Sequence, residues 1–400
     1  MESKFPWRAL IYAYLSMFAF AVTFQAIPPV LGFIISSLGI SHTYAGALMS
    51  FFAIPGIIIA IPGGILSDIY GPRRMGIISL IISLVGCLLV GLGGSFSVLV
   101  AGRFISGIGA LIVSIIALQT ISCWFTKKDL GSAMGIFNTA MPVGTILSLN
   151  IFNRLAVVWG WRIPIILTAA FNLFILALYL FWHPGLPNKG AQLKANKPDV
   201  LKEIFSVKGV GWPIWFVAAI WMMFNAAGIS FLTFASDYYI SVGYDVGYAG
   251  FLASLFMIGS LVFSPLVGYL IDKAGGEAHF IIAGTIVSAI LLYLVPVTGI
   301  NPLYLGGLLG LSAAFIPTPV YSLVPKYLPP NKQGMGYGIL SAGLNIGILA
   351  GPLLVGLSYD QVQNYIFGFK LMAIFSITTA VIALFLQLRF PTPTSNRKEK

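Results

Sequence analysis

The feature that most constrains this chain is a series of long apolar runs, separated by short polar connections, that extends over nearly its whole length. An α-helix needs roughly 20 predominantly apolar residues to cross the hydrocarbon core of a bilayer. Charged residues make up 8% of the chain, whereas soluble domains carry about 25%, so an ordinary soluble fold is excluded. The runs predict an all-α membrane protein with transmembrane helices over residues 9–36, 44–68, 74–94, 97–121, 130–150, 162–182, 212–236, 247–271, 279–298, 302–324, 334–358 and 366–388.

One long polar segment divides these twelve spans into two sets of six. It carries Lys189, Lys194, Lys197, Lys202 and Lys208. The predicted domains are an N-terminal six-helix half (1–183), a cytoplasmic linker (184–211), a C-terminal six-helix half (212–390) and a disordered cytoplasmic tail (391–400).

The positive charges predict how the chain is oriented. With the N-terminus in the cytoplasm, 18 of the 22 Lys and Arg residues fall in cytoplasmic segments. Arg154, Arg162 and Lys370 lie outside, and Arg103 lies within a span. Cytoplasmic loops of membrane proteins are enriched in these residues, so both termini are expected in the cytoplasm. The first apolar run is too long for a cleavable signal peptide, and the short loops favour a multi-pass protein of a prokaryotic inner (plasma) membrane.

A polar motif recurs at the second loop of each half. Residues 63–75 read GGILSDIYGPRRM, and residues 268–276 read GYLIDKAGG. The spacing Gly64-x-x-x-Asp68-x-x-Gly71 is repeated in the second segment around Asp272. Internal repeats of this kind are typical of secondary transporters.

The first motif, Gly-x-Leu-x-Asp-x-x-Gly-x-Arg-Arg, resembles the loop-two motif of the major facilitator superfamily, and RFISGIGA at residues 103–110 resembles that family's span-four arginine motif. The resemblance implies two six-helix halves that work by alternating access. It also implies that the loop is a cytoplasmic latch between the halves. The latch residues would be Gly64, Asp68, Gly71, Arg73 and Arg74, with Asp272 as a weaker counterpart. For the two arginines, a purely topological role is the alternative.

Substrate is expected near the bilayer midplane, where buried polar residues are costly and usually functional. Arg103 stands out because no span centre holds an acidic residue. Either it bonds to span one, through Gln25 or backbone carbonyls, or it also attracts an anionic substrate. The candidate binding residues are Arg103, Gln25, Gln119, Asn138, Asn225, Tyr321 and Asn345, and each amide has helix packing as its alternative role.

Asp237 ends span seven on the outer side. We interpret it as a solvated helix end, with an outer gate as the alternative. No Asp, Glu or His lies in the middle of a span. Transport is therefore expected to be uniport, to use a weak acid that carries its own proton, or to use a boundary acid such as Asp237 for proton coupling.

The sequence thus predicts a secondary transporter for a small organic anion or weak acid, by symport or facilitated transport. Residues 124–144 loosely resemble organic-anion and monocarboxylate carriers, although the span-eight arginine of the latter is missing. The alternatives are a proton-coupled drug or amphiphile exporter and a carrier of a neutral, sugar-like solute. No nucleophile–base set or metal cluster suggests an enzyme. The expected partners are the substrate, a coupling proton and membrane lipid; we expect a monomer without cofactor, metal or nucleic acid.

Overall fold

The computed structural model describes residues 6–125, 130–181, 211–329 and 333–391. Within these ranges it contains twelve helices, some of them interrupted, that are long and apolar enough to cross a membrane. This confirms the predicted all-α fold with twelve spans. In chain order the elements are α1 (Trp7–Phe24), η1 (Pro28–Val30), α2 (Leu31–Leu38), α3 (His42–Tyr70), α4 (Pro72–Leu92), α5 (Phe96–Trp124), α6 (Leu130–Asn138), α7 (Ala140–Leu147), η2 (Ser148–Phe152), α8 (Asn153–Trp159), α9 (Arg162–Phe181), α11 (Trp212–Ser241), α12 (Val246–Ala274), α13 (Glu277–Val297), α14 (Pro302–Ala314), α15 (Pro317–Tyr327), α16 (Gln333–Val362) and α17 (Tyr365–Arg389).

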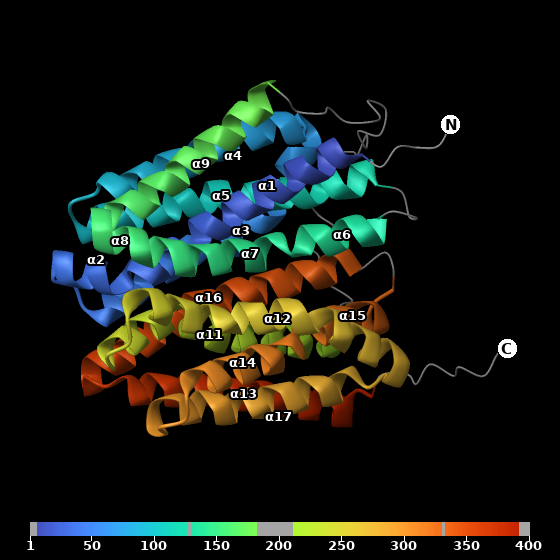
Figure 1. The fold of residues 1–400 in the computed structure, drawn as a ribbon. Helices are drawn as coiled ribbons and strands as arrows, with labels where there is room; N and C mark the ends of the chain where they lie inside the picture. The colour runs from blue at the N-terminus through green and yellow to red at the C-terminus, as the bar shows by residue number, and fades with distance from the viewer. Residues whose placement is uncertain (1–5, 126–129, 182–210, 330–332, 392–400) are drawn as a thin grey trace.

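The helices form two bundles that lie side by side, α1–α9 in one and α11–α17 in the other (Figure 1). We call these bundles the N-half and the C-half. α1 begins and α17 ends at the same end of the molecule, and α2 and α8 lie at the opposite end (Figure 1). We call that opposite end the distal end. The largest cluster of buried apolar side chains includes Val30 and Met49 from the N-half and Phe231 from the C-half, so the two halves share a core.

The motif that recurs in the sequence is also a structural repeat. α3 and α12 are both 29 residues long, and α4 and α13, which follow them, are both 21 residues long. Gly71 and Gly275 end the first pair of helices with φ angles of 83° and 67°. Only glycine adopts positive φ at little cost, which explains why both motifs place glycine at this position.

The first span is broken where two prolines follow each other. α1 ends at Phe24, and the short 3₁₀ turn η1 begins at Pro28. Proline has no backbone N–H. The carbonyls of Phe24 and Gln25 therefore lack the donors that a continuous helix would give them, from Pro28 and Pro29.

The fifth span extends beyond its predicted end at residue 150. α6, α7, η2 and α8 continue to Trp159, with a π-helical turn at Ser148–Phe152. The predicted end of the span is wrong. Asn150 and Asn153 do not lie at the membrane surface; they form hydrogen bonds with the C-half. Single π-helical turns occur frequently at functional sites.

Candidate functional site

The two halves meet at the distal end along two lines of helix contact. In the first, α3 packs against α16; in the second, α7, η2 and α8 pack against α12. We call these contacts the first seam and the second seam. In the described part of the chain, the hydrogen bonds between the halves fall in these seams or on α11 and α17 beside them.

At the first seam, a carboxylate of the C-half caps a helix of the N-half. Asp360, near the end of α16, accepts hydrogen bonds from the backbone N–H groups of His42 (2.9 Å) and Thr43 (2.8 Å) and from the Thr43 hydroxyl. The first N–H groups of a helix have no partner within the helix, and a negative charge there is favoured by the helix dipole. The cap of α3 is therefore supplied across the interface.

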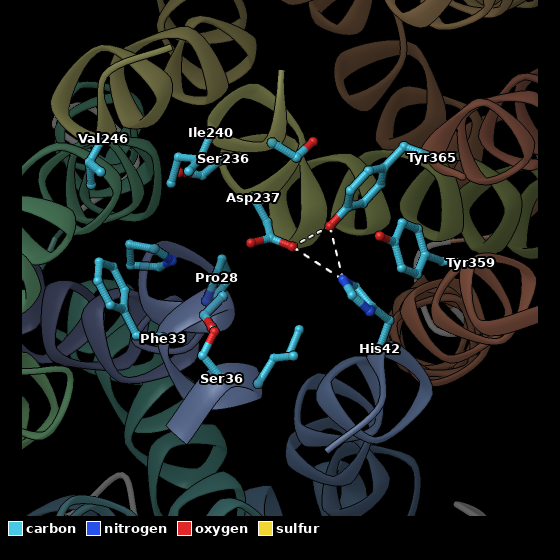
Figure 2. A pocket seen from close by; sticks show the side chains of 14 residues that line it. Pro28, Phe33, Ser36, His42, Ser236, Asp237, Ile240, Val246, Tyr359 and Tyr365 are labelled. Atoms are coloured by element: carbon cyan, nitrogen blue, oxygen red, sulfur yellow. Dashed lines mark hydrogen bonds and ion pairs between the residues drawn. The ribbon is translucent and has the colours of Figure 1, made fainter. Parts of the chain in front are cut away.

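The imidazole of His42 faces three helices of the C-half (Figure 2). Its Nε2 lies 3.1 Å from the Tyr365 hydroxyl and 3.4 Å from the Asp237 carboxylate, and its Nδ1 lies 3.8 Å from the Asp360 carboxylate. The Tyr359 ring packs on the imidazole, with 3.8 Å between ring centroids. Groups from α11, α16 and α17 thus converge on the first residue of α3.

Asp237 also closes the interface. Its carboxylate accepts a hydrogen bond from Tyr365, and its side chain is only 16% exposed. It packs so tightly against Gly32 of α2 that a Cβ at that glycine would overlap its Oδ1. The interpretation of Asp237 as a solvated helix end is therefore wrong, because other residues cover the carboxylate from both halves.

A pocket of about 400 Å³ lies between the halves at this level. Pro28, Phe33 and Ser36 line it from the N-half, and Asp237 and Tyr365 line it from the C-half (Figure 2). Its walls are mostly apolar, and the imidazole and one carboxylate face into it. Such a site can exchange protons or hold a small polar group.

The hydrogen bonds described across the second seam come from neutral side chains. Asn150 Nδ2 donates to the Ser254 hydroxyl at 3.0 Å. Asn153 Nδ2 donates to the Ser236 hydroxyl at 2.8 Å and to the Val246 carbonyl at 3.2 Å. Sequence reasoning missed both asparagines. Their spacing of three residues, which places them on one face of a helix, was the available signal.

Arg103 is held by backbone carbonyls, one of the two roles predicted for it. Its guanidinium donates to the carbonyls of Thr23 (2.8 Å), Phe24 (3.0 Å) and Leu48 (3.0 Å). It also stacks over the Phe52 ring at 4.4 Å. The Phe24 carbonyl is one that the prolines leave without a helical donor. Arg103 is 2% exposed, so in this conformation it joins α1, α3 and α5.

Gln25 follows these carbonyls directly and is completely buried. Neither its Nε2 nor its Oε1 has a hydrogen-bond partner in the described part of the chain. An unpaired buried amide is costly. The turn η1, which begins three residues later, packs against α11 of the C-half. Gln25 is therefore an unsatisfied polar group close to the interface between the halves.

The other predicted binding residues are spread over both halves. Asn225 is buried and donates to the Trp221 carbonyl of its own helix at 2.7 Å. Asn345 is buried, donates to the Ser341 carbonyl, and packs against Gly56 of α3. Tyr321 is exposed, with its ring 5.3 Å from that of Trp221.

The remaining two predicted binding residues, Gln119 and Asn138, belong to the N-half. Gln119 is half-buried on α5, and Asn138 is exposed at the end of α6. The structure thus places Tyr321 against the Trp221 ring and Asn225 one helical turn after Trp221, and it places Arg103 beside the break that precedes Gln25.

The predicted latch lies at the end of the molecule opposite the distal end. Arg73 donates to the carbonyls of Tyr179 (3.3 Å) and Leu180 (2.7 Å), at the end of α9 in its own half. Arg74 is exposed. The side chains of Asp68 and Asp272 and the surroundings of Gly64 lie outside what the structure describes. The latch stays a prediction.

Known proteins resemble this chain over most of its length. It is 24% identical to the lysosomal dipeptide transporter MFSD1 of Danio rerio, over 85% of this chain and 77% of that protein. It is 27% identical to multidrug resistance protein 1 of Bacillus subtilis, over 91% and 92%, and 25% identical to the nitrite extrusion protein of the same species, over 90% of each.

The fold also matches a solved transporter. A bacterial homolog of the human lysosomal transporter Spinster, in an inward-facing and unoccupied conformation, superposes with a TM-score of 0.80 at 16% identity, over 97% of this chain and 98% of that one. The model of the Major Facilitator Superfamily matches residues 13–249 and 228–400. With its twelve spans, its repeated halves and this match over nearly its whole length, the chain belongs to the Major Facilitator Superfamily.

Proposed function

We propose that this transporter carries a small organic anion or weak acid by alternating access, by symport or facilitated transport. We further propose that it lies in a plasma (inner) membrane with both termini in the cytoplasm, which makes the distal end the outer one. The cationic residues of the loops support this orientation. Relatives of similar identity are named for a dipeptide, for nitrite and for multiple drugs, so the choice of substrate class depends on the site itself.

The observation that carries the anion proposal is the buried charge of Arg103. None of the ion pairs in the described residues includes it, and its guanidinium is held only by neutral carbonyls, the sulfur of Met49 and an aromatic ring. Among the described residues of the N-half, no negative charge therefore neutralises its positive charge. In a medium of low dielectric constant, such a charge attracts an anion over several ångströms.

Gln25 is the residue we propose for direct contact. It is the next residue after one of the carbonyls that bind Arg103, and both of its amide atoms are free to bond. Its Nε2 would donate to a carboxylate oxygen of the substrate. Arg103, which is almost fully enclosed, would act through its charge and by holding the break in span one in place.

Thermal stabilisation of the purified protein tests this proposal. A ligand that binds the folded state raises the melting temperature by mass action. The panel contains small carboxylates, sugars and lipophilic cations. Carboxylates are expected to stabilise the wild type and to lose most of that effect in Gln25→Leu, which removes the polar atoms of the side chain.

The matched control is Gln387→Leu, which changes an amide on α17 that bonds to His279. This variant should respond to carboxylates as the wild type does. If sugars or lipophilic cations stabilise the wild type and carboxylates do not, the anion proposal is wrong. If carboxylates stabilise Gln25→Leu fully, the anion proposal stands but Gln25 does not contact the substrate.

A further inference from the structure

His42 is the one residue of the N-half whose side chain faces two carboxylates of the C-half in the described part of the chain. The titratable groups around its ring are Asp237 on α11, Tyr359 and Asp360 on α16, and Tyr365 on α17. None of the contacts described for the ring comes from a lysine or an arginine. We propose that His42, Asp237 and Asp360 form a proton-binding site, and that a proton bound there holds the distal end closed.

The hydrogen-bonding capacity of imidazole is the first argument. A neutral imidazole has one N–H donor, whereas the protonated ring has two. Both ring nitrogens of His42 face a carboxylate, Nε2 toward Asp237 at 3.4 Å and Nδ1 toward Asp360 at 3.8 Å. The neutral ring can donate toward only one of them. The protonated ring can donate toward both, and it lowers the net charge of the three groups from −2 to −1.

The division of these groups between the halves is the second argument. His42 begins α3 and belongs to the N-half, whereas both carboxylates belong to the C-half. When the halves separate at the distal end, the imidazole loses both acceptors at once. The closed state therefore binds the proton more tightly than the open state, and by linkage the proton favours the closed state.

The third argument is that protons from the solution can reach His42. The His42 side chain is 16% exposed and lines the distal pocket, so it can exchange protons with the solution on that side. Histidine is the side chain that ordinarily changes its charge between about pH 5 and pH 8. An acidic solution at the distal end is therefore expected to favour the closed state, and a more alkaline solution is expected to favour the open state. The site rests on the alternating access of the proposed function and is independent of its substrate.

A distance measurement between the halves tests the proposal. Gly94 and Gly299 lie in distal connections of the N-half and the C-half, and each has open space where a side chain would begin. Cysteines placed there carry spin labels, after serine has replaced the native Cys87 and Cys123. Double electron–electron resonance on the full chain in lipid nanodiscs then gives the ratio of closed to open molecules.

In the wild-type background, this ratio is expected to fall by at least about fivefold between pH ~5.5 and pH ~8, the lower end of typical coupling between a ligand and a conformational equilibrium. His42→Gln should abolish the dependence on pH. His279→Gln is the matched control, because His279 is exposed at the opposite end of the molecule and bonds to Gln387 of its own half. It should retain the full dependence.

The proposal is overturned if the wild-type ratio does not change with pH, or if His42→Gln changes as the wild type does. Should His42→Gln fail to fold, Asp237→Asn serves in its place and should reduce the dependence, and an unchanged dependence would again contradict the proposal. Gly46→Val, which forces a side chain into the first seam, shows whether the distal end can open at all. If the distance stays fixed in that variant too, alternating access itself is wrong; if it changes there but not with pH, only the proton site is wrong.

Discussion

The two seams at the distal end join the same two halves with different chemistry. The internal repeat relates them, because α3 and α12 occupy equivalent positions in their halves. The first seam closes with carboxylates, an imidazole and a helix terminus, whereas the second closes with asparagine amides and serine hydroxyls. The fold thus determines which helices meet, whereas the side chains determine whether that contact responds to the pH of the solution.

The largest effect is expected from adding a methyl group where each seam is tightest. A Cβ at Gly46 would overlap the Pro352 carbonyl in the first seam, and one at Gly250 would overlap the Leu149 carbonyl in the second. Both atoms belong to backbone and cannot rotate away, so each Gly→Ala variant should weaken closure by about 1–3 kcal/mol, as overpacking of a core does. The distance between labels at residues 94 and 299 measures the change.

Gly307→Ala is the matched control for these two variants, since a Cβ there meets nothing within 4 Å. It should leave the closed fraction unchanged and keep or slightly raise the melting temperature. A closed fraction that stays at the wild-type level in either seam variant would show that the seam does not hold the halves together.

Asp360→Ala is expected to have the next largest effect, because it removes the carboxylate that caps α3 across the interface. Loss of an N-cap costs about 0.5–2 kcal/mol, and here the capped helix and the cap belong to different halves. The variant should therefore lower the closed fraction. Asn301→Ala is the counterpart, because Asn301 caps α14 within its own half; it should lower the melting temperature without opening the distal end. Equal opening in both variants would contradict this difference.

Asn153→Ala tests the second seam. It removes the bonds to Ser236 and Val246, each worth about 1 kcal/mol. The same label distances should show a lower closed-to-open ratio, by the same factor at pH ~5.5 and pH ~8, because none of these partners changes its charge in the range where histidine does. A strong pH dependence of this loss would remove the chemical distinction between the seams.

Ser50→Ala is expected to have the smallest effect. The Ser50 hydroxyl donates across the first seam to the Leu349 carbonyl, and its loss should weaken closure by about 0.5–1 kcal/mol. Ser114→Ala, which removes a bond to Leu111 in the same helix, should not change the closed fraction. If the two variants behave alike, this bond does not contribute to closure.

The sequence predicted the twelve spans because the length and apolar content of a run follow directly from the thickness of the bilayer. One of the two roles that it predicted for Arg103 was bonding to span one, and Arg103 does so through the carbonyls of Thr23 and Phe24. A buried guanidinium with no acid nearby needs other acceptors, and the two prolines supply one of them.

The distal seams could not be predicted from the sequence, for a physical reason. His42, Asp237 and Asp360 each lie near the end of a helix, where polar residues are ordinary in any membrane protein. Their role depends on which helices pack together. Here a hydrogen bond joins residues that lie more than three hundred positions apart in the sequence. Asn153 was not considered as a site residue because the predicted span five ended at residue 150. Gln25 was predicted, but only the structure shows that both of its amide atoms are unpaired.

The double proline in the first span has a consequence for how the halves move. Because Pro28 and Pro29 lack N–H groups in every conformation, the Phe24 carbonyl needs an outside donor whichever way the transporter faces. Arg103 is that donor, and it binds Leu48 of α3 as well. We therefore expect α1, α3 and α5 to travel as one rigid body through the transport cycle, so that the bending required by alternation falls in other helices of this half, such as α7 and the π-helical turn that follows it.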